Sequence, residues 1–284
     1  MAASLDGTDG LTFNDNTLMG SANSLGTRNI LFNADFRINQ RAYVSAATLA
    51  AGAYGHDRFK AGASGGDYSF TQLASSTQVT IASGKSLIQV VEDKNVVGGS
   101  YVLSWTGTAF ARVGVNSATP SGTFVVSPLL ITGQTAGTTM SVEFNAGTLN
   151  TAQLELGTVA TPFERRPIGL ELALSQRYFM PVLRMINESA GTGMCISTVT
   201  AQIYVRLPVE MRAVPTVAFS ALANILLVNA TGNSAGTLTS LNLTLGHVNV
   251  VRLDCTVASG LIGGNITNLQ AATTSARLSL SAEL

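Results

Sequence analysis

Charged residues and histidines are scarce in this sequence. Aspartate, glutamate, lysine and arginine make up 11% of its 284 residues, and the net charge is zero, whereas a typical soluble domain has about 25% charged residues. A surface so poor in charge offers little attraction to nucleic acid or to an anionic membrane. His56 and His247 are the only histidines, which all but excludes a catalytic triad or a multi-histidine metal site. The composition therefore predicts no metal, no cofactor and no nucleic-acid partner.

Cysteine is also scarce, and long apolar runs are missing. Cys195 and Cys255 each lie in an apolar, strand-like run without metal-site spacing, so we expect buried free thiols rather than a disulfide. The segment from Met1 to Gly7 has no basic region followed by an apolar core, and it is not expected to be a signal peptide. No apolar run approaches the ~18 residues of a membrane-spanning helix, so membrane insertion is not expected.

Paired carboxylates are one remaining route to catalysis, because two of them can cleave a glycosidic bond. Glu92 and Asp93 are adjacent, so on a strand they point to opposite faces. Glu155 and Glu164 form a second candidate pair, but Glu164 precedes two arginines, and an ion pair is the simpler explanation. We therefore predict no catalytic residues and no enzymatic activity.

A phosphate-loop motif is not present either. The segment 83–86 reads Ser-Gly-Lys-Ser, but Val79 stands where the motif needs its first glycine, and no helical pattern follows. The segment is instead predicted to be a turn between two strands.

Between residues 28 and 167, apolar and polar residues alternate with the period of β-strands. Tyr101, Leu103 and Trp105 share one face of such a run, and turn signals containing glycine separate one run from the next. Many short strands at this spacing predict a β-sandwich. Strands are expected at 68–73, 78–81, 87–91, 101–106, 110–115, 123–126, 129–132, 139–144 and 152–156.

The pattern changes once, after residue 167. Leu170 and Leu174 recur at a four-residue step, Pro167 can begin a helix and Pro181 ends it. We therefore expect a connector helix over residues 168–180 and a second β-rich domain over residues 181–284. The strand-like runs of that domain lie at 202–207, 238–245, 248–257 and 276–280.

Four ordered motifs lie between residues 28 and 167. Residues 29–41 and 153–167 resemble the opening and closing strands of one fold. His-Asp-Arg-Phe at 56–59 is similar to its "DRW" strand start, and residues 98–107 are similar to its "G-x-Y-x-L-S-W" strand. That fold is the carbohydrate-binding-module-like β-sandwich of bacteriophage tail fibres and other virion appendages. The resemblance implies a jelly-roll-like β-sandwich over residues 28–167.

The flanking segments resemble other parts of phage fibre proteins. Residues 10–22 are similar to the "L-T-F-x-D-x-T" segments that precede globular domains, and few apolar residues in this region could form a core. The resemblance implies that residues 1–27 form an extended attachment arm, with a flexible tail as the alternative. Residues 171–178 resemble the "E-L-A-L-C-Q-R-Y" connector, with serine in place of cysteine. Residues 208–217 resemble an element of fibre tip domains, which implies a tip or cap.

The resemblance implies a fibre or spike of the virion, assembled in the host cytoplasm. It implies a homotrimer that contacts other virion proteins through its arm and binds bacterial surface polysaccharide without catalysis. Weak sugar sites become effective when several copies bind together. The alternative is an architectural head-decoration, baseplate or tail component without sugar affinity, and both possibilities remain open at this point.

Aromatic rings are the first candidates for sugar binding, because they stack on the apolar faces of sugars. Trp105 shares a strand face with core-type residues, and Phe59 takes the tryptophan position of "DRW", so both are expected in the core. Tyr43, Tyr54 and Tyr68 lie in or near segments rich in glycine or serine. We therefore predict these three tyrosines to be exposed carbohydrate-binding residues.

Three polar residues of the 56–59 motif are assigned structural roles. Asp57 and Arg58 are expected to orient a strand start, and His56 to take part in structural hydrogen bonding. His247 follows a glycine at a predicted turn and is expected to be solvated.

Overall fold

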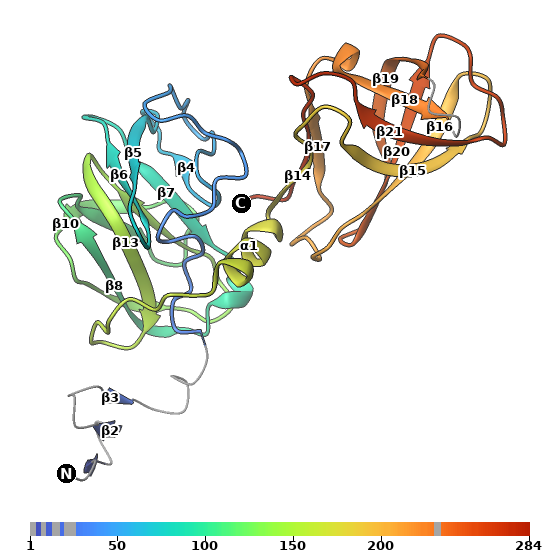
Figure 1. The fold of residues 1–284 in the computed structure, drawn as a ribbon. Helices are drawn as coiled ribbons and strands as arrows, with labels where there is room; N and C mark the ends of the chain where they lie inside the picture. The colour runs from blue at the N-terminus through green and yellow to red at the C-terminus, as the bar shows by residue number, and fades with distance from the viewer. Residues whose placement is uncertain (1–3, 7–9, 13–17, 20–26, 230–233) are drawn as a thin grey trace. The chain divides into compact units, whose positions relative to one another are not determined.

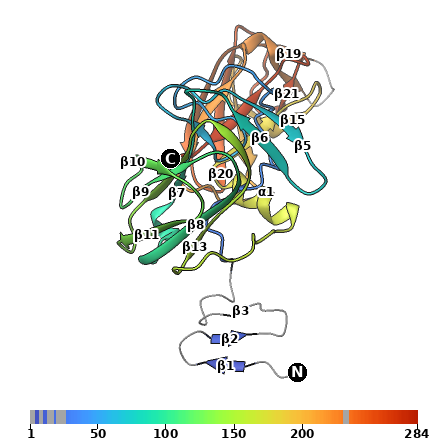
Figure 2. The same ribbon diagram turned by 90° about the vertical axis from the view of Figure 1, so that its left-hand side faces the viewer.

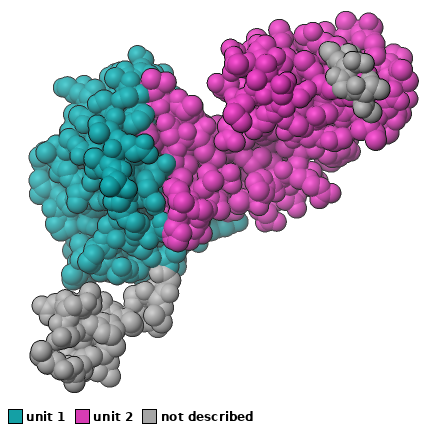
Figure 3. Space-filling model, viewed as in Figure 1, with its two compact units in different colours: residues 1–37, 45–53, 59–166 teal, residues 38–44, 54–58, 167–284 magenta. Residues whose placement is uncertain are grey.

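The computed structural model describes residues 4–6, 10–12, 18–19, 27–229 and 234–284. Antiparallel β-sheets dominate these residues, which confirms the all-β prediction. The chain forms two compact units (Figures 1 and 3), of which unit 1 comprises residues 1–37, 45–53 and 59–166, and unit 2 comprises residues 38–44, 54–58 and 167–284. Within the described ranges, no helix has the length and apolar character needed to cross a membrane.

Unit 1 is built on two five-stranded antiparallel sheets, in the orders β10-β9-β12-β7-β4 and β11-β8-β13-β6-β5. The predicted strand positions agree with these elements to within a few residues, because each run alternates clearly between core and surface. The strands are β4 (Lys60–Ala61), β5 (Tyr68–Gln72), β6 (Thr77–Ile81), β7 (Leu87–Val91), β8 (Gly99–Gly107), β9 (Ala111–Gly114), β10 (Ser121–Val125), β11 (Leu129–Gln134), β12 (Met140–Phe144) and β13 (Gly147–Leu156), with a 3-10 turn η2 at Asp93–Asn95.

The two sheets face each other across a core that includes Trp105. Its ring, on β8, meets the ring of Phe144 on β12 edge to face, with the centroids 5.6 Å apart. The indole N–H donates to the Ala109 carbonyl oxygen over 2.7 Å, so the polar group of a ring that is 7% exposed is satisfied. Phe59 is fully buried and stacks on Phe36. The core assignments of Trp105 and Phe59 are confirmed.

The opening and closing motifs meet, although residues 29–41 are not a strand as predicted. The Asn29 side chain takes the place of a strand partner for β13. Its Nδ2 donates to the Ala152 carbonyl oxygen over 2.9 Å, and its Oδ1 accepts from the Leu154 N–H over 3.1 Å. The Asn29 backbone N–H donates to Glu164 over 2.8 Å, so Glu164 receives a backbone donor rather than the expected arginine.

Three short strands precede the sandwich in the chain. β1 (Ser4–Asp6), β2 (Gly10–Thr12) and β3 (Leu18–Met19) pair in antiparallel fashion, side by side in Figure 2. The rest of the predicted arm up to residue 26 lies outside the described residues, so the arm stays a prediction.

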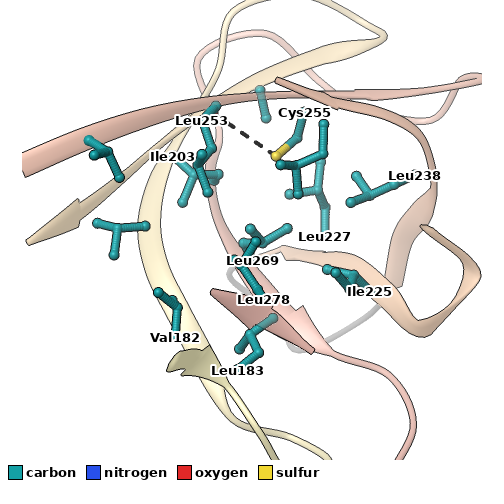
Figure 4. Close-up of a cluster of buried hydrophobic side chains, with 14 of the residues drawn as sticks. Val182, Leu183, Ile203, Ile225, Leu227, Leu238, Leu253, Cys255, Leu269 and Leu278 are labelled. Carbon is teal, nitrogen blue, oxygen red and sulfur yellow. Dashed lines mark hydrogen bonds between the residues drawn. The ribbon is translucent and has the colours of Figure 1, made fainter. Parts of the chain in front are cut away.

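Unit 2 contains a closed barrel and a three-stranded sheet. The barrel order is β15-β16-β20-β19-β18-β21, and the sheet order is β14-β22-β17. Apolar side chains from the inner faces of these strands form one core (Figure 4). The strands are β14 (Phe179–Leu183), β15 (Ser189–Cys195), β16 (Thr200–Arg206), β17 (Thr216–Phe219), β18 (Ile225–Asn229), β19 (Ser234–Gly246), β20 (Val250–Val257), β21 (Ile266–Ala271) and β22 (Leu278–Ser281), with a 3-10 turn η3 at Leu222–Asn224.

The connector helix exists but differs from the prediction. α1 (Ile168–Gln176) ends before the predicted limit at residue 180, because β14 begins soon afterwards and pairs with β22, about a hundred residues later. Its buried positions are Glu171 and Ser175, whereas Leu170 is 43% exposed. The four-residue step of Leu170 and Leu174 therefore marked the helix correctly but not its buried face.

Cys195 and Cys255 are buried free thiols, as predicted. In the barrel register Cys195 lies opposite Ala201, and Ala201 lies opposite Cys255 on the next strand. Two strand spacings place the cysteine Cα atoms roughly 10 Å apart, beyond the ~7 Å limit for a disulfide. Burial raises the pKa of both thiols, that of Cys255 to about 12.

Candidate functional site

The three tyrosines predicted to bind sugar do not form one site. Tyr68 lies on β5 of unit 1, where it is 1% exposed and contacts Phe70 at 6.3 Å between ring centroids. The prediction that Tyr68 is exposed is wrong, because the strand alternation turns its ring into the core. Tyr43 and Tyr54 belong to the segments 38–44 and 54–58, which group with unit 2 and not with the sandwich as predicted.

Tyr43 and Tyr54 are half-buried and have protein partners. The Tyr43 ring meets the His56 ring edge to face, with centroids 6.5 Å apart. The Tyr54 hydroxyl donates to the Leu284 carbonyl oxygen over 2.8 Å, and the Arg41 guanidinium lies 4.8 Å from its ring centroid. Burial raises the pKa of Tyr54. These contacts leave less ring surface for stacking, and a sugar-binding role for either tyrosine stays a prediction.

Arg41, Arg58 and Glu283 form a largely buried charge cluster within unit 2. Arg41 Nη2 lies 3.0 Å from Glu283 Oε1, and Arg58 Nη1 binds the other carboxylate oxygen. The Arg58 guanidinium lies 3.5 Å from the Tyr178 ring centroid. The backbone of Arg58 has a φ of 71°, a left-handed conformation that costs energy in residues other than glycine. Arg212 donates to two backbone oxygens after β22, over 2.9 and 3.1 Å. The charge cluster therefore anchors the segment after β22.

His56 and Asp57 are buried next to Arg58 in the chain. Burial lowers the pKa of His56 to about 4. Burial also raises the pKa of Asp57 to about 6, although Gln40 opposes this shift by donating its backbone N–H over 2.6 Å and its amide over 3.0 Å. Each of the three residues is thus held by the protein itself, and β4 follows within two residues of Arg58.

A hollow of about 310 Å³ lies on unit 1 and is the candidate functional site. Arg112 on β9 and Glu143 on β12 alternate with the core residues Ala111 and Phe144, so they lie on the outer face of their sheet. The turn between β4 and β5, the turn before β7 and the turn between β12 and β13 complete the walls. The residues around the hollow are Ala63, Ser64, Gly84, Lys85, Ser86, Arg112, Phe124, Glu143, Asn145 and Ala146.

An ion pair forms the floor of the hollow. Arg112 and Glu143 lie directly opposite each other in the sheet register, with Nε 2.6 Å from Oε2. Ser86 Oγ donates to the other carboxylate oxygen over 2.6 Å. The guanidinium of Arg112 lies over the ring of Phe124 on β10, 4.6 Å from its centroid. These contacts fix the pair before any ligand arrives, and the Glu143 side chain is only 5% exposed.

The hollow has more hydrogen-bond donors than its own residues use. A guanidinium has five N–H donors, and Arg112 uses only Nε and Nη1 within the described protein. Lys85 Nζ donates to one carbonyl oxygen over 2.8 Å and lies 3.7 Å from Asp67. Asn145 Oδ1 accepts a backbone N–H over 2.8 Å, which leaves its amide group as a donor. A ligand rich in hydroxyl or carboxylate oxygens matches this set.

Sequence reasoning did not find the hollow. It predicted the turn at 83–86 correctly, and Gly84 has a φ of 73° there, but it gave Lys85 no role. The available signal was a single outward charge on each of two strands, Arg112 and Glu143, in a chain with few charges. Their pairing depends on the register of β9 and β12, which β10 and β11 separate in the sequence.

Comparisons with known proteins add little. No family model and no curated protein matches the chain. Discoidin II of Dictyostelium discoideum is 11% identical with a TM-score of 0.19, over 90% of this chain and 93% of that chain. A conserved protein of unknown function from Pseudomonas aeruginosa is 11% identical with a TM-score of 0.14, over 77% of this chain and 95% of that chain. TM-scores this low carry no argument about function.

Proposed function

We propose that this chain is a bacteriophage virion protein, a fibre or spike that attaches to bacterial surface glycans by non-catalytic, multivalent binding. The four ordered sequence motifs between residues 28 and 167 support the virion assignment. The hollow on unit 1 supports glycan binding, and its preformed Arg112–Glu143 pair with spare donors around it is the observation that carries the proposal. The proposed assembly is a homotrimer of jelly-roll-like sandwiches, formed in the host cytoplasm and attached to other virion proteins by residues 1–27. Unit 2 would be its tip or cap.

The chemistry of the hollow favours binding over hydrolysis. Glu143 is the one carboxylate among the residues around the hollow, and both of its oxygens already accept hydrogen bonds. Cleavage of a glycosidic bond ordinarily needs two carboxyl groups flanking that bond. The spare N–H donors, in contrast, suit the hydroxyl and carboxylate oxygens of a bacterial polysaccharide.

Binding of the full-length protein to capsular and lipopolysaccharide glycans on an array tests the proposal. Lys85→Ala and Phe124→Ala should each weaken binding by about tenfold, or roughly 1.4 kcal/mol, because one removes a donor and the other the ring under Arg112. Lys94→Ala is the charge-matched control, since Lys94 is exposed on the η2 turn and does not border the hollow. Its binding should equal that of the parent.

The same experiment separates the alternatives. If the parent binds no bacterial glycan, the protein is better described as an architectural head-decoration or baseplate component. If Lys94→Ala weakens binding as much as Lys85→Ala, the hollow is not the site. A fall in the viscosity of capsule preparations would instead reveal a depolymerase and contradict non-catalytic binding.

A further inference from the structure

One outer face of the barrel in unit 2 carries four exposed apolar side chains. They are Met194, Ile196, Ile262 and Ile266, which are 51%, 49%, 65% and 61% exposed. We call these four residues the apolar face. Large apolar side chains that gather on a surface mark interaction sites, whereas scattered ones carry no such meaning.

The hydrogen-bond register shows that these residues are neighbours. Met194 on β15 lies directly opposite Ile266 on β21, so both side chains stand on the same face of the sheet. Ile196 follows β15 directly. Ile262 belongs to the turn whose Gly264 N–H donates to the Cys195 carbonyl oxygen over 2.8 Å. The four residues therefore lie close together where β15 ends and β21 begins.

Strands β15 and β21 carry no charge, and the nearest charges in the register, Arg252 beside Tyr204 and Asp254 beside Gln202, pair with each other over 3.0 Å. Residues 189–205, which include β15 and most of β16, contain no Asp, Glu, Lys, Arg or His. Residues 255–276, which include β21, contain none either. A partner that is recognised by opposite charge finds no net charge here. A second copy of the same face meets neither like-charge repulsion nor a charge that must be stripped of water.

We infer that the apolar face is the surface through which copies of this chain pack against one another. An interface of standard size covers about 800 Å² on each partner, which is more than four side chains supply. The uncharged neighbours Thr192 and Tyr204 extend it, because they face each other in the register of β15 and β16 and both are exposed. Apolar residues at the centre with a polar rim are the usual anatomy of an interface.

This inference does not require glycan binding, although several copies would supply the multivalency of the proposed function. Light scattering on the full-length parent at micromolar concentration should give a multiple of the 29.4 kDa chain mass. Ile266→Lys should weaken association by at least about tenfold, because the same lysine on each copy meets its equivalents across the contact. Met194→Lys is a second, independent variant with the same expectation.

Asn242→Lys is the matched control. Asn242 is exposed on β19, which lies across the ring from β15 in the barrel order. This variant should associate like the parent, and circular dichroism should show all three variants folded. Glycan binding measured on the same samples keeps the two proposals separate, since a monomeric Ile266→Lys protein retains the hollow of unit 1.

Several results would overturn the inference. They are a monomeric parent, an Asn242→Lys protein that dissociates as readily as Ile266→Lys, and a folded Ile266→Lys or Met194→Lys protein that stays fully associated. Flotation of a monomeric parent with neutral phosphatidylcholine vesicles, abolished by Ile266→Lys, would assign the apolar face to lipid instead.

Discussion

The sandwich and the barrel use polar side chains in opposite ways. In unit 1, buried Asn29 hydrogen-bonds to the Ala152 carbonyl oxygen 123 residues away in the chain, and buried Gln153 and Glu155 hydrogen-bond to each other. Among the described residues of the six barrel strands, Thr267 is the one buried polar residue. The charged residues of unit 2 that are buried, Asp57, Arg58 and Glu171, lie instead outside the barrel strands.

This difference separates two ways of specifying a fold. Directional hydrogen bonds fix which segments meet in the sandwich, because an unsatisfied buried group is costly. In the barrel, closure of the sheet and apolar packing are enough to fix which strands pair, because a closed sheet has no free edge strand. The comparison predicts that truncating an apolar core side chain destabilises either unit. Truncating a polar side chain should destabilise unit 1 or the charge cluster but not the barrel wall.

The largest effect is expected from Trp105→Ala in the sandwich core. Removing a buried large aromatic costs about 3–5 kcal/mol, because the loss of apolar burial adds to the cavity left behind. The free energy of unfolding in urea and the melting temperature should both fall sharply. A variant that melts like the parent but no longer binds polysaccharide would move Trp105 from the core to a binding surface.

Glu283→Ala should cost nearly as much, although Glu283 lies outside the barrel strands. Buried Arg58 and Arg41, whose side chain is 17% exposed, would both lose their carboxylate, and breaking a buried ion pair from one side typically costs about 3–5 kcal/mol. Glu188→Ala is the control, because its partner Arg184 is 56% exposed and such pairs contribute about 0–1 kcal/mol. Equal urea midpoints for the two variants would show that the charge cluster does not hold unit 2.

The pH dependence of stability should reveal two opposing groups beside that cluster. Asp57 has a pKa raised from 3.8 to about 6, so its contribution is present at low pH and is lost as the pH rises through 6. His56 has a pKa lowered from 6.5 to about 4, so its contribution is present above pH 6.5 and is lost as the pH falls through 4. Between about pH 4 and 6 the two slopes nearly cancel in the parent.

Single substitutions should expose each slope. In His56→Gln the free energy of unfolding should fall by up to about 3 kcal/mol from pH 4 to 6, since each pH unit corresponds to about 1.4 kcal/mol. In Asp57→Asn it should rise over the same range. Urea titrations at pH 4, 5 and 6 measure both. Parallel curves for the two variants would contradict the assigned shifts.

Asn29→Ala tests the hydrogen-bonded part of the comparison. The substitution leaves the Ala152 carbonyl oxygen and the Leu154 N–H without their side-chain partner, and each buried unsatisfied group costs about 1–3 kcal/mol. Asn242→Ala, at an exposed position of the barrel wall, should stay within about 0.5 kcal/mol of the parent. If both variants unfold alike, the polar contrast between the two units is wrong.

The features that could be predicted from the sequence are those that depend on the local alternation of apolar and polar residues or on composition. Strands of the sandwich, the core position of Trp105 and the free thiols followed from period and composition. β15 was missed because Gly191 and Gly193 suggest a turn, whereas in the barrel they let β15 lie close to β16. An added Cβ at Gly193 would lie 1.7 Å from the Gln202 carbonyl oxygen. The pattern of residues within β15 does not reveal this close approach to the paired strand.

Long-range pairing explains the other differences. Arg41 ends one of the sandwich motifs and Arg58 lies within another, and only the folded chain shows that Glu283 is their partner. The hollow likewise depends on the register that brings Arg112 opposite Glu143. Of the candidate sugar-binding residues, Tyr68 was misassigned because a serine-rich neighbourhood suggested exposure, while its own place in the alternation is a core position.

The charge cluster also sets an order of events during synthesis. Glu283 lies 242 residues after Arg41 and 225 residues after Arg58. At a synthesis rate of about 5–20 residues per second, the arginines wait roughly 10–50 s for their carboxylate. The sandwich has all of its strands by then and is free to fold, whereas the charge cluster of unit 2 forms only after Glu283 has been translated.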